Sequence, residues 1–320
     1  MTGEKTFLIT GGTGFLGSAL TKHLLSTGSK VRTLSRNEHS VEKLVKDCGN
    51  ESALSCLLGS VEDLPRLKKA LRGVTHVVHA AAQKIVPLAE YDPASCVKTN
   101  VQGTANVADA CLEAGVETAV LISTDKASAP ATLYGATKLC AERLWLGSNR
   151  YSAGNGTRYL GVRYGNVWGS AGSVLHAWGA AHAQGNPISL TDPRCTRFHL
   201  TLEEACSFVL SALEHASAGD LLIPKLPTYR MGDLAHAFRL AYGMEAQPSI
   251  VGLRLAEKLH EDLISQHESV ACKEQDETRY VLTPGTVRER GGWGYSSGQV
   301  GRQFGVEELT RMVELWKGRG

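Results

Sequence analysis

Short apolar runs alternate with amphipathic segments along the first half of the chain. Phe7–Ile9 is such a run, and Phe15–Leu25 carries apolar residues at helical spacing. The same alternation predicts strands at 31–34, 53–58, 74–80, 117–122 and 160–162, and helices at 64–71, 97–114 and 134–146. Strands separated by helices indicate a parallel sheet that is covered on both faces. The predicted fold class is therefore α/β, a Rossmann-type doubly wound parallel sheet.

A glycine-rich turn joins the first predicted strand to the first predicted helix. Glycine at this point permits a tight turn, a close approach of backbone to a pyrophosphate and close packing of the helix, whose N-terminus attracts phosphate. A glycine-rich connector is the alternative, but the position between strand and helix favours dinucleotide binding. The residues expected to hold the cofactor here are Gly11, Thr13, Gly14, Phe15, Leu16 and Gly17.

The second half of the chain has a different pattern. Glycine and proline are frequent between Gly147 and Pro193, and short strands (221–223, 249–252) then mix with helices (202–216, 231–241). We expect residues 1–165 to form a dinucleotide-binding Rossmann domain. Residues 166–320 should form mainly a smaller C-terminal substrate-binding lobe, with some segments returning to the first domain.

Composition excludes several classes of protein. The 320 residues are 42% hydrophobic and 21% charged, which is typical of a globular protein, and the net charge of +2 indicates no nucleic-acid or membrane partner. Eight scattered cysteines without a CxxC pair indicate neither a disulfide framework nor a metal site. A first strand that begins near residue 5 leaves no room for a signal peptide. We expect a cytoplasmic protein without a bound metal.

The ends of the predicted strands form the expected ligand edge, because ligands of such sheets bind outside the carboxyl ends of the strands. The second strand ends in Ser35 and Arg36. An arginine suits a 2′-phosphate, whereas an acidic residue would suit a free ribose, so NADP is expected rather than NAD; a solvated surface arginine is the alternative. Later strand ends add small residues that let a cofactor lie close: Gly59, Ser60, Val61, Ala80, Ala81 and Ala82.

The candidate chemistry follows the fifth strand. Tyr134 and Lys138 are four residues apart, so they share one face of a helix. A lysine beside a phenol lowers the pKa of the phenol and makes it a usable base, and Thr124 adds a hydroxyl upstream. Asp125 and Lys126 form an adjacent carboxyl and amine that can act as acid and base, although such a pair is often a solvated turn.

These motifs resemble those of the extended short-chain dehydrogenases/reductases. More narrowly, the chain is similar to the inverting UDP-N-acetylglucosamine 4,6-dehydratases of surface-sugar biosynthesis, over roughly residues 5–300. The matching stretches are HAAAQKIVPLAEYDP at 79–93, KTNVQGTANV at 98–107, STDKASAPATLYGATKLCAERL at 123–144, RYGNVWGSAGSV at 163–174, TDPRCTRFHLTLEEA at 191–205 and EKLHEDLI at 257–264. Related C5-inverting sugar enzymes often carry methionine at the position of Tyr134, so the tyrosine favours the dehydratase branch.

The resemblance implies roles for the candidate residues. Tyr134, with Thr124 and Lys138, would take the O4 proton; Lys126 would remove the C5 proton; Asp125 would protonate the departing C6 hydroxyl. It adds Lys84, Asn100, Tyr164 and Asn166 to the cofactor site. The substrate site it implies consists of Lys84, Thr124, Arg163, Asn166, Ser173, Val174, Thr191, Arg197, Glu257 and Lys258. Arg197 would clamp the diphosphate of a UDP-linked sugar, which suits a bidentate guanidinium; a structural arginine is the alternative.

Two departures from the family pattern bear on the substrate, and a third lies where the adenine ring of the cofactor would sit. Ala171 replaces a usual arginine, Leu255-Ala256 replaces Pro-Gly, and Ser60 replaces a usual aspartate. A nucleotide-sugar C4 or C5 epimerase therefore stays open as the enzymatic alternative to a 4,6-dehydratase, and a redox-sensing or scaffold protein as the non-enzymatic one. A homo-oligomer is expected through the helices at 97–114 and 134–146, where Ala105, Ala108, Leu139 and Leu144 would pack between subunits.

Overall fold

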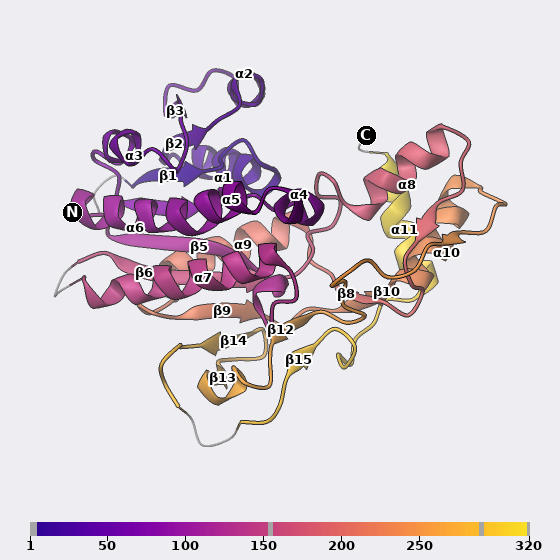
Figure 1. The fold of residues 1–320 in the computed structure, drawn as a ribbon. Helices are drawn as coiled ribbons and strands as arrows, with labels where there is room; N and C mark the ends of the chain where they lie inside the picture. The colour runs from indigo at the N-terminus through magenta and orange to yellow at the C-terminus, as the bar shows by residue number, and fades with distance from the viewer. Residues whose placement is uncertain (1–4, 153–155, 288–290, 319–320) are drawn as a thin grey trace.

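The centre of the protein is a nine-stranded sheet (Figure 1), seen in a computed structural model that describes residues 5–152, 156–287 and 291–318. From one edge to the other its strands are β3 (Leu54–Leu58), β2 (Lys30–Ser35), β1 (Thr6–Thr10), β4 (His76–His79), β5 (Thr118–Thr124), β6 (Arg158–Tyr164), β9 (Leu221–Pro224), β14 (Arg279–Leu282) and β13 (Cys272–Glu274). Neighbours from β3 to β9 run parallel, and β14 and β13 are antiparallel additions. The strand order 3-2-1-4-5-6 confirms the predicted doubly wound fold.

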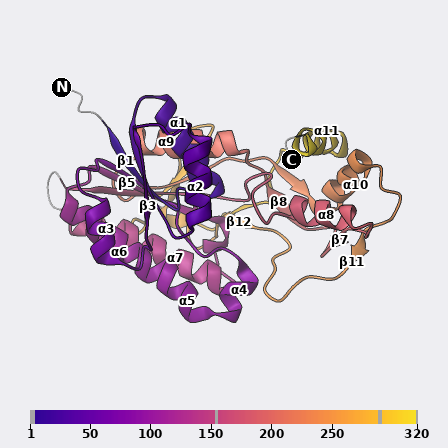
Figure 2. The same cartoon turned by 90° about the horizontal axis from the view of Figure 1, so that it is seen from above.

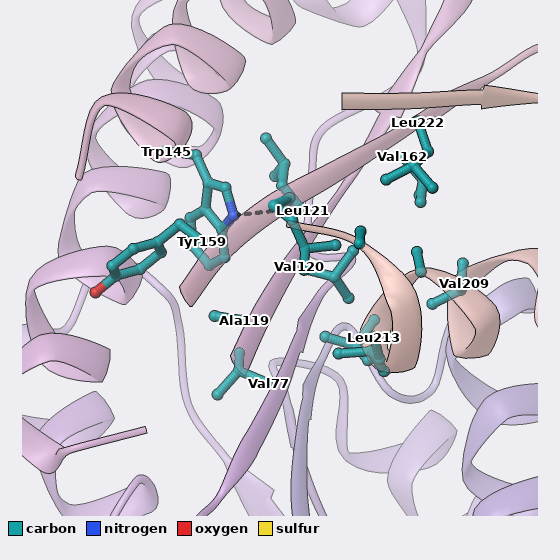
Figure 3. Packing of buried hydrophobic residues seen from close by; sticks show 14 of the residues in the cluster. Val77, Ala119, Val120, Leu121, Trp145, Tyr159, Val162, Val209, Leu213 and Leu222 are labelled. Atoms are coloured by element: carbon teal, nitrogen blue, oxygen red, sulfur yellow. Dashed lines mark hydrogen bonds between the residues drawn. The ribbon is translucent and has the colours of Figure 1, made fainter. Parts of the chain in front are cut away.

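Helices cover both faces of this sheet, as Figure 2 shows. One face carries α1 (Phe15–Ser26) and α9 (Leu202–His215); the other carries α3 (Leu64–Ala70), α6 (Gly103–Ala114) and α7 (Leu133–Gly147), and α2 (Glu38–Asp47) lies beside β3. The central strands are consequently buried on both sides and rich in apolar residues. Figure 3 shows Val209 and Leu213 of α9 near Val120, and Trp145 of α7, whose Nε1 donates to the Leu160 carbonyl at 2.9 Å.

A smaller group of elements lies beyond the carboxyl ends of the strands. It consists of α8 (Val174–Ala183), α10 (Met231–Tyr242), α11 (Val306–Lys317), the pair β8 (Thr196–Phe198) with β10 (Thr228–Arg230), and the pair β7 (Ser189–Leu190) with β11 (Ser249–Ile250). These elements share a second hydrophobic cluster that includes Trp178, Phe238 and Leu309. A further pair, β12 (Asp262–Ile264) with β15 (Tyr295–Ser296), runs beside the turn after β5. Within the described residues, no helix has the length and apolarity that crossing a bilayer requires.

The segment predicted as one helix over 97–114 is in fact broken. It begins as α5 (Pro93–Val97), which follows α4 (Val86–Tyr91), and then widens into a π-helical turn over Lys98–Gln102 before α6. Asn100 lies in this turn, and its side chain bonds the loop after β4 and helix α7. Apolar periodicity does not report such a bulge, because the extra residue changes the face only locally.

Candidate active site

A cavity of about 490 Å³ opens at the carboxyl ends of the parallel strands. It brings together all the predicted cofactor residues except Asn100. They are Gly11, Thr13, Gly14, Phe15, Leu16, Gly17, Ser35, Arg36, Gly59, Ser60, Val61, Ala80, Ala81, Ala82, Lys84, Tyr134, Lys138, Tyr164 and Asn166. Thr124 and Lys126 line the same cavity, so the candidate catalytic groups face the space predicted for a dinucleotide.

The glycine turn is shaped by close backbone contacts. Gly11 has φ +70°, and a Cβ there would lie 2.9 Å from the backbone nitrogen of Ala81. A Cβ at Gly17 would collide with the carbonyl oxygen of Gly11. Helix α1 starts directly behind this turn with Gly14 at its N-cap, and Gly14 has no side chain to cap the helix. The N–H groups of the first helical turn are thus left for a ligand, as phosphate binding requires.

Arg36 stands at the end of β2, where the adenosine ribose of a dinucleotide is expected. Its side chain is 58% exposed and only loosely paired, with Nη1 4.0 Å from Oε1 of Glu62. The preceding Ser35 accepts a hydrogen bond from the Thr13 hydroxyl at 3.1 Å, which ties the end of β2 to the glycine turn. The guanidinium is therefore available for an anion at the cavity wall.

Helix α7 begins close to the turn that carries Asp125 and Lys126. Thr132 caps it by accepting a hydrogen bond from the backbone of Gly135 at 3.1 Å. A Cβ at Gly135 would collide with the carbonyl oxygen of Lys126, so only glycine allows this approach. Tyr134 and Lys138 follow on one face of α7, and both are buried at the cavity wall.

The electrostatics of Tyr134 differ from the sequence-based prediction. Burial raises the pKa of its phenol to about 12, and the cation that acts in the opposite direction is Lys126 rather than Lys138. The Lys138 ammonium instead donates to the Ile122 carbonyl at 2.7 Å, and burial lowers its pKa to about 8 despite Glu142. The prediction that Lys138 lowers the pKa of the phenol is therefore corrected for the free protein, because the ammonium is directed to the backbone of β5.

Asp125 and Lys126 form a tight pair at the end of β5. Oδ1 of Asp125 accepts from the Thr124 hydroxyl at 2.8 Å and from Nζ of Lys126 at 3.1 Å. Oδ2 of Asp125 is buried and has no hydrogen-bond partner among the described residues. Such an orphaned oxygen is costly unless a ligand supplies a hydrogen bond to it, so it suits a group that meets a bound substrate. Of Asp125 and Lys126, only Lys126 lines the cavity.

A second acidic residue, Glu261, completes this group. Oε1 of Glu261 lies 3.5 Å from Nζ of Lys126, and the Glu261 side chain is nearly buried. Burial alone would lower the pKa of Lys126, but Asp125 and Glu261 outweigh it and raise the pKa. Glu261 was not among the site residues predicted from the sequence. Its only signal was its place in EKLHEDLI, because nothing local shows that residue 261 reaches a turn near residue 125.

Arg163 does not face the cavity, and its assignment to the substrate site is corrected. Its guanidinium is fully buried behind β6, where Nε and Nη2 donate to Glu142 at 3.0 and 2.6 Å, and Nη1 and Nη2 donate to Glu268 at 2.9 and 2.8 Å. Residues alternate between the two faces of a strand, so Arg163 and Tyr164 point in opposite directions. Tyr164 takes the cavity face and Arg163 the interior.

The predicted place of Asn100 in the cofactor site is also corrected. Its side chain is buried, accepts from the backbone of Gln83 at 2.8 Å and donates to the Thr137 hydroxyl at 3.1 Å. It thus supports the loop after β4 instead of lining the cavity. Residues that line the cavity but were absent from the prediction sit beside predicted ones: Leu34, Asn37, Thr99, Ile122, Ser123, Gly165, Val167 and Ser170.

The remaining predicted substrate residues lie outside the cavity wall. Arg197 Nη2 pairs with Oε1 of Glu257 at 3.3 Å, and the Thr191 hydroxyl donates to the same oxygen at 3.2 Å. Lys258 donates to the Ser128 carbonyl at 3.0 Å. Ser173 and Val174 stand at the start of α8, and the Ser173 hydroxyl is buried without a partner among the described residues. Their contact with substrate stays a prediction.

A doubly wound sheet whose fifth strand is followed by a Tyr-x-x-x-Lys helix at the cofactor cavity defines the extended short-chain dehydrogenases/reductases. Residues 7–283 match the family model described as polysaccharide biosynthesis protein, and the chain belongs to this family. It is 42% identical over 283 residues to a UDP-N-acetylglucosamine 4,6-dehydratase (inverting) of Campylobacter jejuni, covering 88% of this chain and 83% of that protein. The resemblance inferred from the sequence is confirmed.

Other relatives and structures are more distant in sequence. A UDP-glucose 4-epimerase of Rickettsia rickettsii is 34% identical over 286 residues, covering 88% of this chain and 83% of that protein. The crystal structure of Pen from Bacillus thuringiensis superposes with a TM-score of 0.90 at 30% identity, covering 97% of this chain and 98% of that one. DesIV of Streptomyces venezuelae, a dTDP-glucose 4,6-dehydratase with NAD and TYD bound, shares the fold with a TM-score of 0.74 at 21% identity, covering 79% and 86%.

Proposed function

We propose that this protein is a nucleotide-sugar 4,6-dehydratase that acts on a UDP-linked N-acetylhexosamine and inverts C5. The observation that carries the proposal is the Asp125–Lys126 pair, whose lysine faces the same cavity as Tyr134. Oxidation at C4 needs a hydride acceptor and one base, the role proposed for Tyr134, whereas the loss of water from C5 and C6 needs a further acid and base. The identity to inverting UDP-N-acetylglucosamine 4,6-dehydratases supports the same reading.

The side chains divide the reaction between them. Tyr134, beside Thr124, takes the proton of the O4 hydroxyl. The resulting 4-ketone acidifies C5–H, so Lys126 can remove that proton, and Asp125 gives a proton to the departing C6 hydroxyl. Because Lys126 rests as an ammonium paired with Asp125, transfer of one proton from Nζ to the carboxylate produces both the neutral base and the protonated acid.

The site fits a nicotinamide dinucleotide. Gly11 and Gly17 lie so close to other backbone atoms that a Cβ at either position would collide with them. The start of α1 has no side-chain cap, and the small residues Ala80–Ala82 line the cavity wall. When bound, the cofactor would accept a hydride from C4 and return it to C6. Gly11, Gly14 and Arg36 would hold its phosphates, and Tyr134 and Lys138 would lie along its reactive end.

For the substrate, we propose predicted residues of the cavity wall together with others that lie outside it in the smaller lobe. Lys84 and Asn166 line the cavity itself. The N–H of Ser173 donates to the Ser170 carbonyl at 2.9 Å, so the start of α8 would offer a phosphate the N–H of Val174 and the unpartnered Ser173 hydroxyl. Arg197, with Thr191, Glu257 and Lys258 around it, would meet the diphosphate after releasing its present carboxylate partner. In this proposal residues 1–165 bind the cofactor, and residues 166–320 mainly bind the substrate.

The alternative within the same family is a C4 or C5 epimerase. The 34% sequence identity to a UDP-glucose 4-epimerase supports this alternative. Incubation of the pure protein with a panel of nucleotide sugars separates the two, because dehydration removes one water and epimerisation removes none. A UDP-N-acetylhexosamine product that has lost one water is expected. A product of unchanged mass, from any sugar of the panel, would favour the epimerase.

The cofactor is expected to be NADP and to copurify with the protein, because the hydride is returned in each turnover. Arg36 is exposed at the end of β2 and can meet a 2′-phosphate. Mass spectrometry of the cofactor released on denaturation identifies it. An Arg36→Glu variant should shift the bound cofactor toward NAD. Recovery of NAD alone from the unchanged protein would contradict the 2′-phosphate argument.

A homo-oligomer is expected from apolar side chains on the helices that cover one face of the sheet. Val97 and Leu144 are 43% and 44% exposed, and Tyr91 of α4 is 88% exposed. Ala108 is excluded from this surface, because it packs inside the chain. Light scattering should give the molar mass of a dimer or a larger oligomer, and Leu144→Glu should weaken the association of the subunits. A clean monomer at micromolar concentration would contradict the expectation.

We also propose that the protein works in the cytoplasm. Seven cysteines carry free thiols in the structure, which suits a reducing compartment: Cys48, Cys56, Cys96, Cys111, Cys140, Cys195 and Cys206.

A further inference from the structure

We propose that Glu261 is a positioning residue for Lys126: its carboxylate fixes Nζ opposite Asp125 and stabilises the ammonium that forms when the lysine accepts the C5 proton. That Lys126 accepts the C5 proton of a sugar is part of the proposed function, and the proposal rests on it. The pairing itself rests on the geometry of the site. Nζ of Lys126 lies 3.1 Å from Oδ1 of Asp125 and 3.5 Å from Oε1 of Glu261.

Glu261 is held firmly by its backbone. Its N–H donates to the Ser297 hydroxyl at 2.9 Å, and the N–H of Ser297 donates back to its carbonyl at 2.8 Å. The Ser297 hydroxyl also donates to the carbonyl of Thr196 at 3.1 Å, which joins β8 to the segment before β12. The carboxylate therefore starts from a fixed backbone, and its side chain is only 6% exposed. A charge fixed in advance costs no reorganisation during the reaction.

Four charged side chains from three parts of the chain surround this carboxylate. Asp125 and Lys126 lie on the turn after β5, Arg197 on β8 with Nε 3.9 Å from Oε1 of Glu261, and Lys258 on the same segment as Glu261. Tyr134 on α7 and Tyr229 on β10 also act electrostatically on or with Lys126. Burial and the neighbouring Asp125 raise the pKa of Glu261, and Lys126, Arg197 and Lys258 oppose this. Lys126 thus sits between two carboxylates.

This arrangement serves the proton transfers in order. The Nζ–H bond first breaks toward Oδ1 of Asp125, which leaves a neutral amine and a protonated acid. The amine then forms a bond to the C5 proton, and the electron pair of the C5–H bond moves toward the 4-ketone. The positive charge that returns to Nζ faces Glu261, so the transition state for this step gains an attraction that the neutral amine lacks.

The first test measures how much neutral amine Lys126 carries, and it needs no substrate. Competitive labelling with acetic anhydride at mildly alkaline pH reports the neutral fraction of each lysine, and peptide mass mapping resolves Lys126, whose side chain is 28% exposed. Lys46, on an exposed pair in α2, is the internal reference. Glu261→Gln removes a carboxylate without changing shape, so Lys126 should label severalfold faster relative to Lys46.

The matched control is Asp262→Asn, which removes the neighbouring carboxylate that pairs with Lys258 and should leave the labelling of Lys126 unchanged. Glu261→Asp moves the carboxylate away from Nζ by one carbon, so the labelling rate of Lys126 should also increase, by less than in Glu261→Gln. This second variant keeps the test valid if the glutamine variant does not fold. Equal labelling of Lys126 in all the folded variants and the unchanged protein would overturn the proposal.

The second test uses the reaction. Loss of a carboxylate beside Nζ lowers the pKa of Lys126. The rate of solvent-deuterium exchange at C5 should therefore begin to rise at a lower pH in Glu261→Gln than in the wild-type protein. In Asp262→Asn, the pH profile of this rate should be unchanged. A wild-type protein that dehydrates its substrate, with the pH profile unchanged in Glu261→Gln, would refute the role of Glu261. A wild-type protein that dehydrates no nucleotide sugar would instead refute the proposed function, while the labelling result would stand.

Discussion

Lys126→Ala is expected to reduce exchange of solvent deuterium into C5 of the substrate by roughly 10²–10⁴-fold, the usual cost of losing a positioned general base. The oxidation at C4 should survive better, because Tyr134, Thr124 and Lys138 remain at the cavity wall. Reduced cofactor should consequently accumulate and show in its absorbance. Isotope incorporation at C5 and the absorbance trace, recorded on the same sample, provide the measurement.

Two companion variants separate the steps. Tyr134→Phe should block exchange as well as oxidation, since no C5 proton is acidic before the 4-ketone forms. Asp125→Asn should slow the loss of the C6 hydroxyl and leave some C5 exchange. Binding of UDP to each variant controls for folding. A Lys126→Ala protein that dehydrates its substrate at close to the wild-type rate would defeat the assignment of the base.

Arg163→Ala should destabilise the protein by about 3–5 kcal/mol, because it removes the buried cation that Glu142 and Glu268 share, while Glu268 keeps only its longer 3.6 Å pair with Arg143 among the described ion pairs. Against a typical stability of about 5–15 kcal/mol, this loss is large. Urea unfolding measures it. Arg194→Ala is the matched control, since Arg194 forms an exposed pair with Asp192 and should leave stability nearly unchanged. A stable Arg163→Ala protein with only a raised KM would restore Arg163 to the substrate site.

The same ion pairs predict an acid dependence. Burial would raise the pKa of Glu268, but its hydrogen bonds and pairing with Arg163 hold it at about 2. A carboxylate with a depressed pKa contributes stability above its ordinary value near ~4.3, and this contribution is lost as the pH falls toward the native value. The wild-type protein should therefore lose stability between these limits, and Arg163→Ala should show a smaller loss. Urea midpoints at several acidic pH values test this.

Local signals were sufficient for the first half of the fold and for the cofactor cavity. Gly11, Gly14 and Gly17 directly follow an apolar run, and Tyr134 and Lys138 are spaced by one helical turn, so their arrangement follows from near neighbours in the sequence. The ends of parallel strands then bring Ser35, Gly59 and Ala80 to one edge without further information.

Partners distant in the chain could not be predicted in this way. Arg163 carries the same strand-end signal as Tyr164, yet Glu142 and Glu268 draw it to the other face. Glu261 reaches Lys126 only because β12 folds back beside the turn after β5. The antiparallel strands β13 and β14 extend the sheet from a region whose short apolar runs have no clear period. In each case, tertiary contact decided between options that the local sequence left equal.

The most direct test of the central claim is turnover of UDP-N-acetylglucosamine by the unchanged protein in deuterated water. We expect a 4-keto product that has lost one water, carries solvent deuterium at C5 and has the inverted C5 configuration. A product that keeps its water and differs from the substrate only in configuration at C4 or C5 would contradict it.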